Sequence, residues 1–200
     1  GPNALFLQQP EGGFLDASLS SGLGQTSAWS SAASFGDLDG DGDLDLYVAN
    51  YVQFDLAALP GPMRFRGTQV FGGPMGLSAE PDEVYFNDGD GVFTSQPFPA
   101  PRPAYGLGVV IADFDINGTQ EVFVGNDSGP NFFFVRREDG SFGDRGLSAG
   151  IGFDENGLGQ ATMGIALSDP NRDGLPDVFS TNFMGDRNTL HLNLGDLLFD

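Results

Sequence analysis

Residues 36–51 read GDLDGDGDLDLYVANY, and this stretch decides the class of fold. Aspartates alternate with glycine and leucine, and a short apolar run follows at once. The same pattern returns at residues 112–127, ADFDINGTQEVFVGND, and at residues 168–183, SDPNRDGLPDVFSTNF. The three copies align without gaps, although their leading aspartates lie 76 and 56 residues apart. Repeats of this length predict a propeller or a solenoid built from similar units.

A second element recurs between the acidic stretches, at residues 1–14, 82–93, 129–142 and 188–199. Each copy has an apolar run, a turn rich in Asn, Asp or Gly, and then Phe, which predicts a β-hairpin. Short β-branched and aromatic runs also flank each acidic loop, and no stretch has a helical period. One repeat therefore reads as four antiparallel strands, the content of one propeller blade. We predict an all-β partial propeller of about three and a half blades.

The domain organisation follows from these repeats. We expect one repeat domain over residues 1–200, with hairpins near 1–16, 34–51 together with 82–95, 105–142 and 163–200. Residues 53–81 form an insertion, either a surface excursion packed on a blade edge or a partner-binding loop. The sequence opens and closes at the same point of the repeat, and three and a half blades cannot close a ring. We expect a part of a longer propeller, or head-to-tail completion by a neighbouring copy.

Each acidic loop follows the pattern D-x-[DN]-x-[DN]-G-x-x-[DE]. Alternate positions bring oxygens to one side of a tight turn, and Gly at the sixth position lets the seventh carbonyl face inward. Oxygen ligands in this number favour Ca²⁺ over Mg²⁺, and softer metals would need His or Cys. The predicted ligands to three Ca²⁺ ions are Asp37, Asp39, Asp41, the Asp43 carbonyl and Asp45 in loop one; Asp113, Asp115, Asn117, the Thr119 carbonyl and Glu121 in loop two; and Asp169, Asn171, Asp173, the Leu175 carbonyl and Asp177 in loop three.

Several classes of protein are excluded. An EF-hand needs Glu at position 12 and flanking helices, whereas position 12 here is Val48, Val124 or Ser180, each in a predicted strand. The net charge of −20 argues against nucleic acid and against an anionic membrane surface. Since no apolar run reaches 18 residues, we expect no membrane insertion. The absence of Cys excludes a disulfide framework and a thiolate metal site.

The motifs resemble a known family. Residues 34–36, SFG, match the FG element, and residues 1–3 and 129–131, both GPN, match the GAP element of FG-GAP (VCBS) repeats in integrin-α-type propellers. Residues 70–88, 105–116, 122–135 and 182–197 are similar to bacterial relatives of cartilage acidic protein, whose propeller is often followed by an ASPIC/UnbV domain. The resemblance implies a secreted or cell-surface protein, with its leader outside this sequence. It also implies calcium binding, and adhesion or scaffolding through an unidentified protein or glycan.

The remaining candidate residues do not favour an enzyme. His191 is the only His and is expected to be a half-exposed sheet residue. Trp29 is expected to pack in the core or at a rim, with sugar stacking as the alternative. Asn126 lies in a glycosylation sequon, and Asn117 does too but is needed by the metal. We expect no enzymatic activity, because no acid, base and Arg constellation lies outside the loops. The alternatives are a subunit of an extracellular filament or surface layer, and a polysaccharide-active propeller enzyme.

Overall fold

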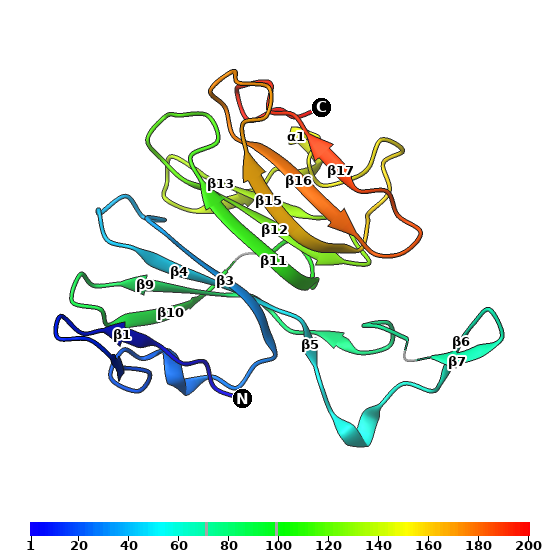
Figure 1. Cartoon of the computed structure of the whole chain (residues 1–200), viewed down its shortest axis with the longest axis horizontal. Coiled ribbons are helices and arrows are strands. Elements are labelled where there is room, and N and C mark those ends of the chain that lie inside the picture. The colour runs from blue at the N-terminus through cyan, green and yellow to red at the C-terminus, as the bar shows by residue number, and fades with distance from the viewer. Residues whose placement is uncertain (71, 99) are drawn as a thin grey trace.

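The structure is a computed structural model that describes residues 1–70, 72–98 and 100–200; Phe71, within the insertion, and Pro99 lie outside the described residues. It confirms an all-β molecule built from antiparallel sheets. Three sheets stand side by side as an open arc, with their first strands next to one another (Figure 1). No described helix is long and apolar enough to cross a membrane.

Two of the three blades have four strands, in the order expected of a propeller blade. The first blade comprises β3 (Ser30–Gly36), β4 (Asp45–Asn50), β9 (Glu83–Asn87) and β10 (Phe93–Pro97). The second comprises β11 (Tyr105–Ala112), β12 (Glu121–Asp127), β13 (Phe132–Arg136) and β14 (Phe142–Asp144). The third has β15 (Thr162–Ser168), β16 (Asp177–Asn182) and β17 (Thr189–His191).

Smaller elements surround the blades. At the N-terminal end β1 (Phe6–Gln8) pairs with β2 (Phe14–Asp16), and a short 3₁₀-helix follows at Leu23–Gln25. The insertion contains a second 3₁₀-helix at Leu56–Ala58 and two strand pairs, β5 (Val52–Gln53) with β8 (Ser78–Ala79) and β6 (Met63–Phe65) with β7 (Thr68–Val70). The one short α-helix, α1, spans Gly146–Ala149 in the described chain.

The repeats share their irregularities as well as their strands. In each blade the first two strands pair directly up to the acidic loop, so Gly36 faces Asp45, Ala112 faces Glu121 and Ser168 faces Asp177. Each ladder also shifts register once near its other end, between residues 30 and 32, 106 and 108, or 162 and 164. The three acidic loops therefore occupy equivalent places in three equivalent hairpins.

The core lies between the blades, because alternate side chains of each central strand face opposite neighbours. Tyr47 of the first blade packs with Val122 and Val124 of the second, while Phe123 packs against Val178 of the third. Tyr47 and Phe123 are completely buried, whereas Phe179, at the same position of the third blade, is 38% exposed. The other outer face, on the first blade, is covered at Leu46 and Val48 by Leu5 and Leu23 of the N-terminal segment, although Phe35 beside Leu46 is 48% exposed. The position of Tyr47 and Phe123 is thus buried between blades and exposed at the outer face of the third blade.

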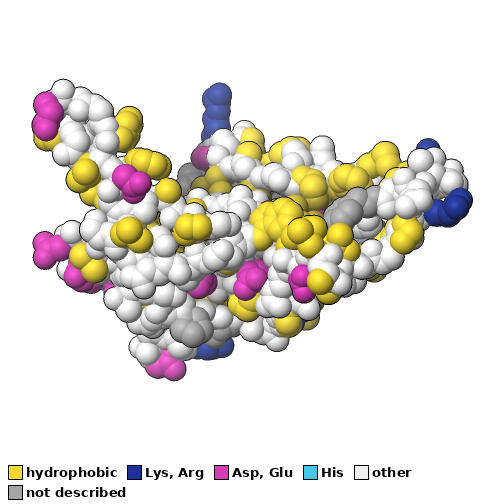
Figure 2. Space-filling view, turned by 90° about the horizontal axis from the view of Figure 1, so that it is seen from below, with side chains coloured by type: hydrophobic (Ala, Val, Ile, Leu, Met, Phe, Trp, Pro, Cys, Tyr) yellow, Lys and Arg dark blue, Asp and Glu magenta, His cyan; other side chains and the backbone are white. Residues whose placement is uncertain are grey.

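The insertion is anchored at its root and otherwise projects outward. The β5–β8 pair forms the root, and the β6–β7 hairpin lies far from the blades (Figure 1). Figure 2 shows hydrophobic side chains along one face of the molecule, with basic groups at its right-hand end and at its upper and lower edges. The described part of the insertion is therefore a surface excursion, with most of its apolar side chains in contact with solvent.

Candidate metal centres

The three acidic loops have the same backbone conformation. Their fourth and sixth positions both have positive φ: Gly40 at 79° and Gly42 at 95° in loop one, Ile116 at 58° and Gly118 at 90° in loop two, and Arg172 at 65° and Gly174 at 91° in loop three. The sixth-position glycine adopts this conformation without a Cβ clash. Ile116 and Arg172 adopt it at a cost of about 1–2 kcal/mol each. The repeat therefore imposes one loop geometry even where the residue disfavours it.

A common hydrogen-bond scaffold orients the side chains inside each loop. The N–H of the sixth-position glycine donates to the first-position carboxylate, at 3.1, 2.8 and 3.0 Å in loops one to three. The seventh-position N–H donates to the side-chain oxygen of the fifth position, at 2.9, 2.7 and 2.9 Å. These bonds turn the first and fifth side chains back over the loop, as the sequence pattern requires.

In loops one and two the carboxylates converge. Asp37, Asp39 and Asp45 each offer an oxygen within 4.8 Å of the others, and Asp113, Asp115 and Glu121 do the same. Each cluster combines the first, third and ninth positions of its loop. The fifth-position side chain of loop one, Asp41, lies outside the cluster. Three carboxylate oxygens this close together can coordinate one cation.

Burial makes the charge in these clusters costly. Asp45 and Glu121, the ninth-position residues, are buried. Burial raises the pKa of Asp45, and burial followed by repulsion from Asp115 and Asp113 raises the pKa of Glu121 to about 7. Burial, helped by repulsion from Asp41, also raises the pKa of Asp39. A bound cation would favour the charged forms and so offset this desolvation.

Loop three differs at its second position. In loops one and two the second-position N–H donates to the ninth-position carboxylate, from Leu38 to Asp45 Oδ2 at 2.8 Å and from Phe114 to Glu121 Oε2 at 2.9 Å. Loop three has Pro170 there, which has no N–H. The other oxygen of Asp177 still accepts from the N–H of Asn193 at 2.7 Å, as Asp45 does from Asn87 at 2.9 Å.

Asp177 Oδ2 is buried without a hydrogen-bond partner. Loop three also has Asn171 at the third position, where loops one and two have Asp39 and Asp115, so its described acidic residues form no cluster of the first, third and ninth carboxylates. Asp115 Oδ1 in loop two is likewise buried and unpartnered. Buried polar atoms normally have a partner, and both of these belong to predicted ligands. The donor set therefore fits a hard cation such as Ca²⁺.

The loops are also joined to one another, which the sequence did not indicate. The N–H of Asp37 in loop one donates to Gln120 Oε1 of loop two at 2.8 Å. The amide of Asn193 donates to the carbonyl of Phe114, also in loop two, at 2.8 Å and so links the third blade to the second. Gln120 is the eighth residue of loop two. Its role depends on contact between blades, which the local pattern does not encode.

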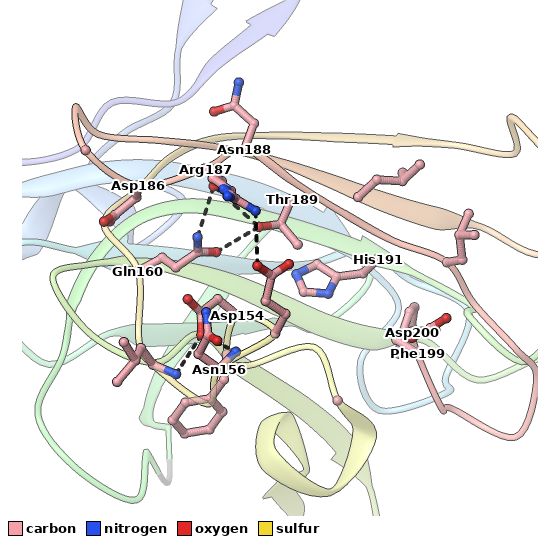
Figure 3. A pocket seen from close by; sticks show the side chains of 17 residues that line it. Asp154, Asn156, Gln160, Asp186, Arg187, Asn188, Thr189, His191, Phe199 and Asp200 are labelled. Carbon is pink, nitrogen blue, oxygen red and sulfur yellow. Dashed lines mark hydrogen bonds and ion pairs between the residues drawn. The ribbon is translucent and has the colours of Figure 1, made fainter.

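A hollow of about 780 Å³ lies beside β17 and contains the only His (Figure 3). His191 is buried, so the expectation of a half-exposed sheet residue is wrong, and burial lowers its pKa to about 4. Gln160 bonds to the Arg187 carbonyl and to Thr189, and Arg187 pairs with Glu155 at 3.2 Å. Among the described residues no hydrogen bond joins the His191 ring to a carboxylate or hydroxyl.

Asn126 and Trp29 are the other two residues with an expectation from the sequence. Asn126 is buried and its side-chain amide donates to the Pro130 carbonyl at 2.8 Å, so the folded chain leaves no room for a glycan there. Trp29 lies at a rim, 48% exposed, in edge-to-face contact with Tyr51 and Phe54. Packing at a rim is therefore the part of the Trp29 expectation that the structure bears out.

Comparison with known proteins identifies related sequences. The FG-GAP-like repeat family matches residues 1–48, which include loop one. Cartilage acidic protein 1 is similar in three species: 38% identical over 80 residues in Homo sapiens, 28% over 153 residues in Xenopus tropicalis and 29% over 170 residues in Mus musculus. These matches cover 40%, 74% and 85% of this chain and 12%, 20% and 24% of the relatives. The chain thus spans at most about a quarter of their length, and the family match over residues 1–48 supports the FG-GAP-type repeats expected from the motifs.

Proposed function

We propose that this chain is an extracellular calcium-binding propeller module that serves adhesion or scaffolding by binding a protein or a glycan. The observation that carries the proposal is the pair of carboxylate clusters at equivalent positions of loops one and two. Similarity to FG-GAP-like repeats and to cartilage acidic protein 1 supports an extracellular setting. We propose Ca²⁺ at loop three as well, with weaker binding.

The proposed role of the metal is to fasten the first two strands of each blade. The first-position Asp directly follows the first strand, and the ninth-position carboxylate begins the second. An ion between them would hold both strand ends to one centre. Without an ion, three carboxylates within 4.8 Å repel one another in loops one and two. Calcium binding and folding of the blades are therefore coupled.

Removal of calcium tests this proposal. A ligand that binds only the native state adds about 2.7 kcal/mol per site when present at about 100 times its Kd. We expect excess EDTA to lower the melting temperature sharply, and added Ca²⁺ to restore it. Added Mg²⁺ should restore less, because its small octahedral shell suits this loop poorly. A melting temperature that does not change in EDTA would overturn the proposal.

A second proposal concerns partners. Phe179 occupies a position that is buried between blades at Tyr47 and Phe123, so the outer face of the third blade is shaped to receive a blade of the same kind. The outer face of the first blade is covered by Leu5 and Leu23 of the N-terminal segment, whose own hairpin exposes Phe6 and Phe14. Head-to-tail contact between copies would bury both surfaces and build a filament, the structural alternative. Light scattering on the 200-residue chain tests this. Concentration-dependent assembly supports it, and a stable, well-folded monomer at micromolar concentration contradicts it.

We propose no enzymatic activity, and release of sugars from polysaccharides would contradict that.

A further inference from the structure

A hollow of about 670 Å³ lies at the end of the first blade away from loop one. A hydrogen bond from the N–H of Tyr51 to the carbonyl of Trp29, at 2.9 Å, prolongs the β3–β4 ladder on that side. At the other end of the ladder Gly36 and Asp45 pair beside loop one. Seven residues of strand separate the two places by about 20 Å. The hollow is thus distinct from the candidate calcium site.

Two exposed aromatic rings form one wall. Trp29 is 48% exposed and Phe54 is 44% exposed, and their rings meet edge to face at 5.3 Å. The Tyr51 ring packs edge to face against Trp29, with 6.3 Å between the ring centroids. The Tyr51 hydroxyl donates a hydrogen bond to Asp127 at 2.6 Å. A single exposed aromatic side chain is ordinary. Two exposed rings, joined and braced beside a hollow, form a preorganised apolar surface for a ligand.

Polar groups complete the lining. Asn3 and Gln53 contribute amides, and Asp55 and Glu80 contribute carboxylates. The β5–β8 pair sets Gln53 opposite Ser78, which fixes the root of the insertion next to the rings. The two ends of the insertion thus supply Phe54, Gln53 and Asp55 from one side and Glu80 from the other. The insertion therefore lines this hollow in addition to forming the projecting hairpin.

This combination matches the chemistry of a sugar. A pyranose ring has an apolar face of C–H groups that packs on an aromatic ring, and hydroxyls that both donate and accept hydrogen bonds. Carboxylates accept from such hydroxyls, and amides donate and accept. No arginine is among the described lining residues, the chain has no lysine, and its net charge is −20. An anionic sugar would therefore be repelled, and a neutral sugar is favoured.

We propose that the hollow beside Trp29 and Phe54 binds a neutral sugar residue of an oligosaccharide. The inference rests on the proposed function as a binding module and names the chemical class of its ligand. An acidic glycan at this site is a different claim, and titration with oligogalacturonate separates it from a neutral sugar.

The intrinsic fluorescence of the protein provides the first test. Trp29 is the only Trp in the chain, so excitation at a wavelength that Trp absorbs and the four Tyr do not makes the signal report on this wall. The calcium-loaded protein is titrated with neutral gluco-, manno-, xylo- and galacto-oligosaccharides, and with oligogalacturonate as the acidic comparison. We expect a saturable shift with at least one neutral oligosaccharide, at a Kd on the order of 1 mM or tighter. No shift with any neutral oligosaccharide, or a shift with oligogalacturonate alone, overturns the proposal.

Variants then locate the site by calorimetry. Trp29→Ala should weaken binding of the active oligosaccharide at least about tenfold, which corresponds to about 1.4 kcal/mol. Gln53→Ala leaves both rings in place and should weaken binding severalfold, so it keeps the test decisive if Trp29→Ala does not fold. Phe183→Ala is the matched control, because Phe183 is an exposed aromatic of the third blade. Unaltered binding by both Trp29→Ala and Gln53→Ala, or equal weakening by Phe183→Ala, overturns the proposal.

The calcium proposal can fail separately. Thermal melting of the same preparations, with Ca²⁺ and with EDTA, is recorded beside each titration. Stabilisation by Ca²⁺ without sugar binding overturns only the sugar site. If sugar binding is lost in Trp29→Ala and the melting temperature does not change with Ca²⁺, the sugar site is supported and the calcium proposal is overturned.

Discussion

Loop three differs from loops one and two at two positions that bear on the metal, because Pro170 has no N–H at the second position and Asn171 replaces a carboxylate at the third. All three loops share their positive φ angles and the bonds made by the sixth and seventh residues. In the first two, the second-position N–H holds the buried ninth-position carboxylate, and three carboxylates converge. Pro170 removes that N–H in loop three, where Asp177 Oδ2 is left unpartnered. A loop can therefore keep its shape and still lose the preorganisation of its ligands.

This difference bears on affinity. A site whose oxygens already lie together loses less free energy to reorganisation when the ion binds. We therefore expect loops one and two to bind Ca²⁺ more tightly than loop three. The count of side-chain carboxylates alone would rank loop one above two equal sites, because loops two and three have three carboxylates each. The arrangement of the oxygens separates those two.

Removal of one ligand from each loop should give the largest effect. Asp39→Ala and Asp115→Ala should each abolish one calcium and about 2–3 kcal/mol of calcium-dependent stability, while Asp173→Ala should cost less. Native mass spectrometry counts the ions, and urea unfolding in Ca²⁺ and in EDTA measures the stability. Asp90→Ala is the control, because Asp90 is an exposed carboxylate outside the loops. If the calcium count stays the same in both Asp39→Ala and Asp115→Ala, the ligand assignment is wrong.

Restoring the missing N–H should reduce the difference. In Pro170→Ala the new N–H can donate to Asp177 Oδ2, and a hydrogen bond to a charged group contributes about 1.5–3 kcal/mol. Part of that gain is offset, because the unfolded chain becomes more flexible by about 0.4–1 kcal/mol. We expect tighter calcium binding at loop three, measured by calorimetry in Asp39→Ala/Asp115→Ala chains so that only this loop contributes.

Pro176→Ala is the matched control for Pro170→Ala. It makes the same chemical change in the same loop, but Pro176 follows the seventh position and does not face the ninth-position oxygen that lacks a donor. Equal calcium affinity in the two variants would show that the second-position N–H does not explain the difference.

The smallest effect should come from the fourth position, where the loops differ in residue but not in shape. Ile116→Gly and Arg172→Gly should each stabilise the metal-free chain by about 1 kcal/mol, because glycine adopts positive φ without a Cβ clash. Gly40→Ala should destabilise it by a similar amount. Leu44→Gly serves as control, since Leu44 is also an exposed loop residue but has no positive φ. The stability of all four variants is measured from their urea midpoints in EDTA. Stabilisation by Leu44→Gly as well would refute the explanation by positive φ.

Local pattern was enough to predict the strands and the loops. The alternation of Asp with Gly fixes tight turns, and the apolar runs after each loop can only be strands of a half-buried or buried sheet. The four-strand blades, the loop at the end of each first hairpin and the convergence of residues 37, 39 and 45 follow from that pattern. The insertion was recognised because it breaks the repeat.

Contacts between distant segments could not be predicted in this way. Burial of His191 depends on how the third blade packs on the second, and the link from Gln120 to Asp37 joins two blades. Pro170 was visible in the sequence, but its effect depends on the burial of Asp177, which only the fold determines. Exposure of Trp29 likewise depends on Tyr51 and Phe54, which lie 22 and 25 residues away.

The most direct test of the central claim is a calcium titration of the chain after exhaustive EDTA treatment. Calorimetry measures the affinity of each site, and native mass spectrometry counts the bound ions independently. We predict two ions bound with higher affinity, at loops one and two, and a third bound more weakly, at loop three. Absence of bound calcium would contradict the assignment of the loops as metal centres. Three sites of equal affinity would contradict the expectation that Pro170 and Asn171 weaken calcium binding at loop three.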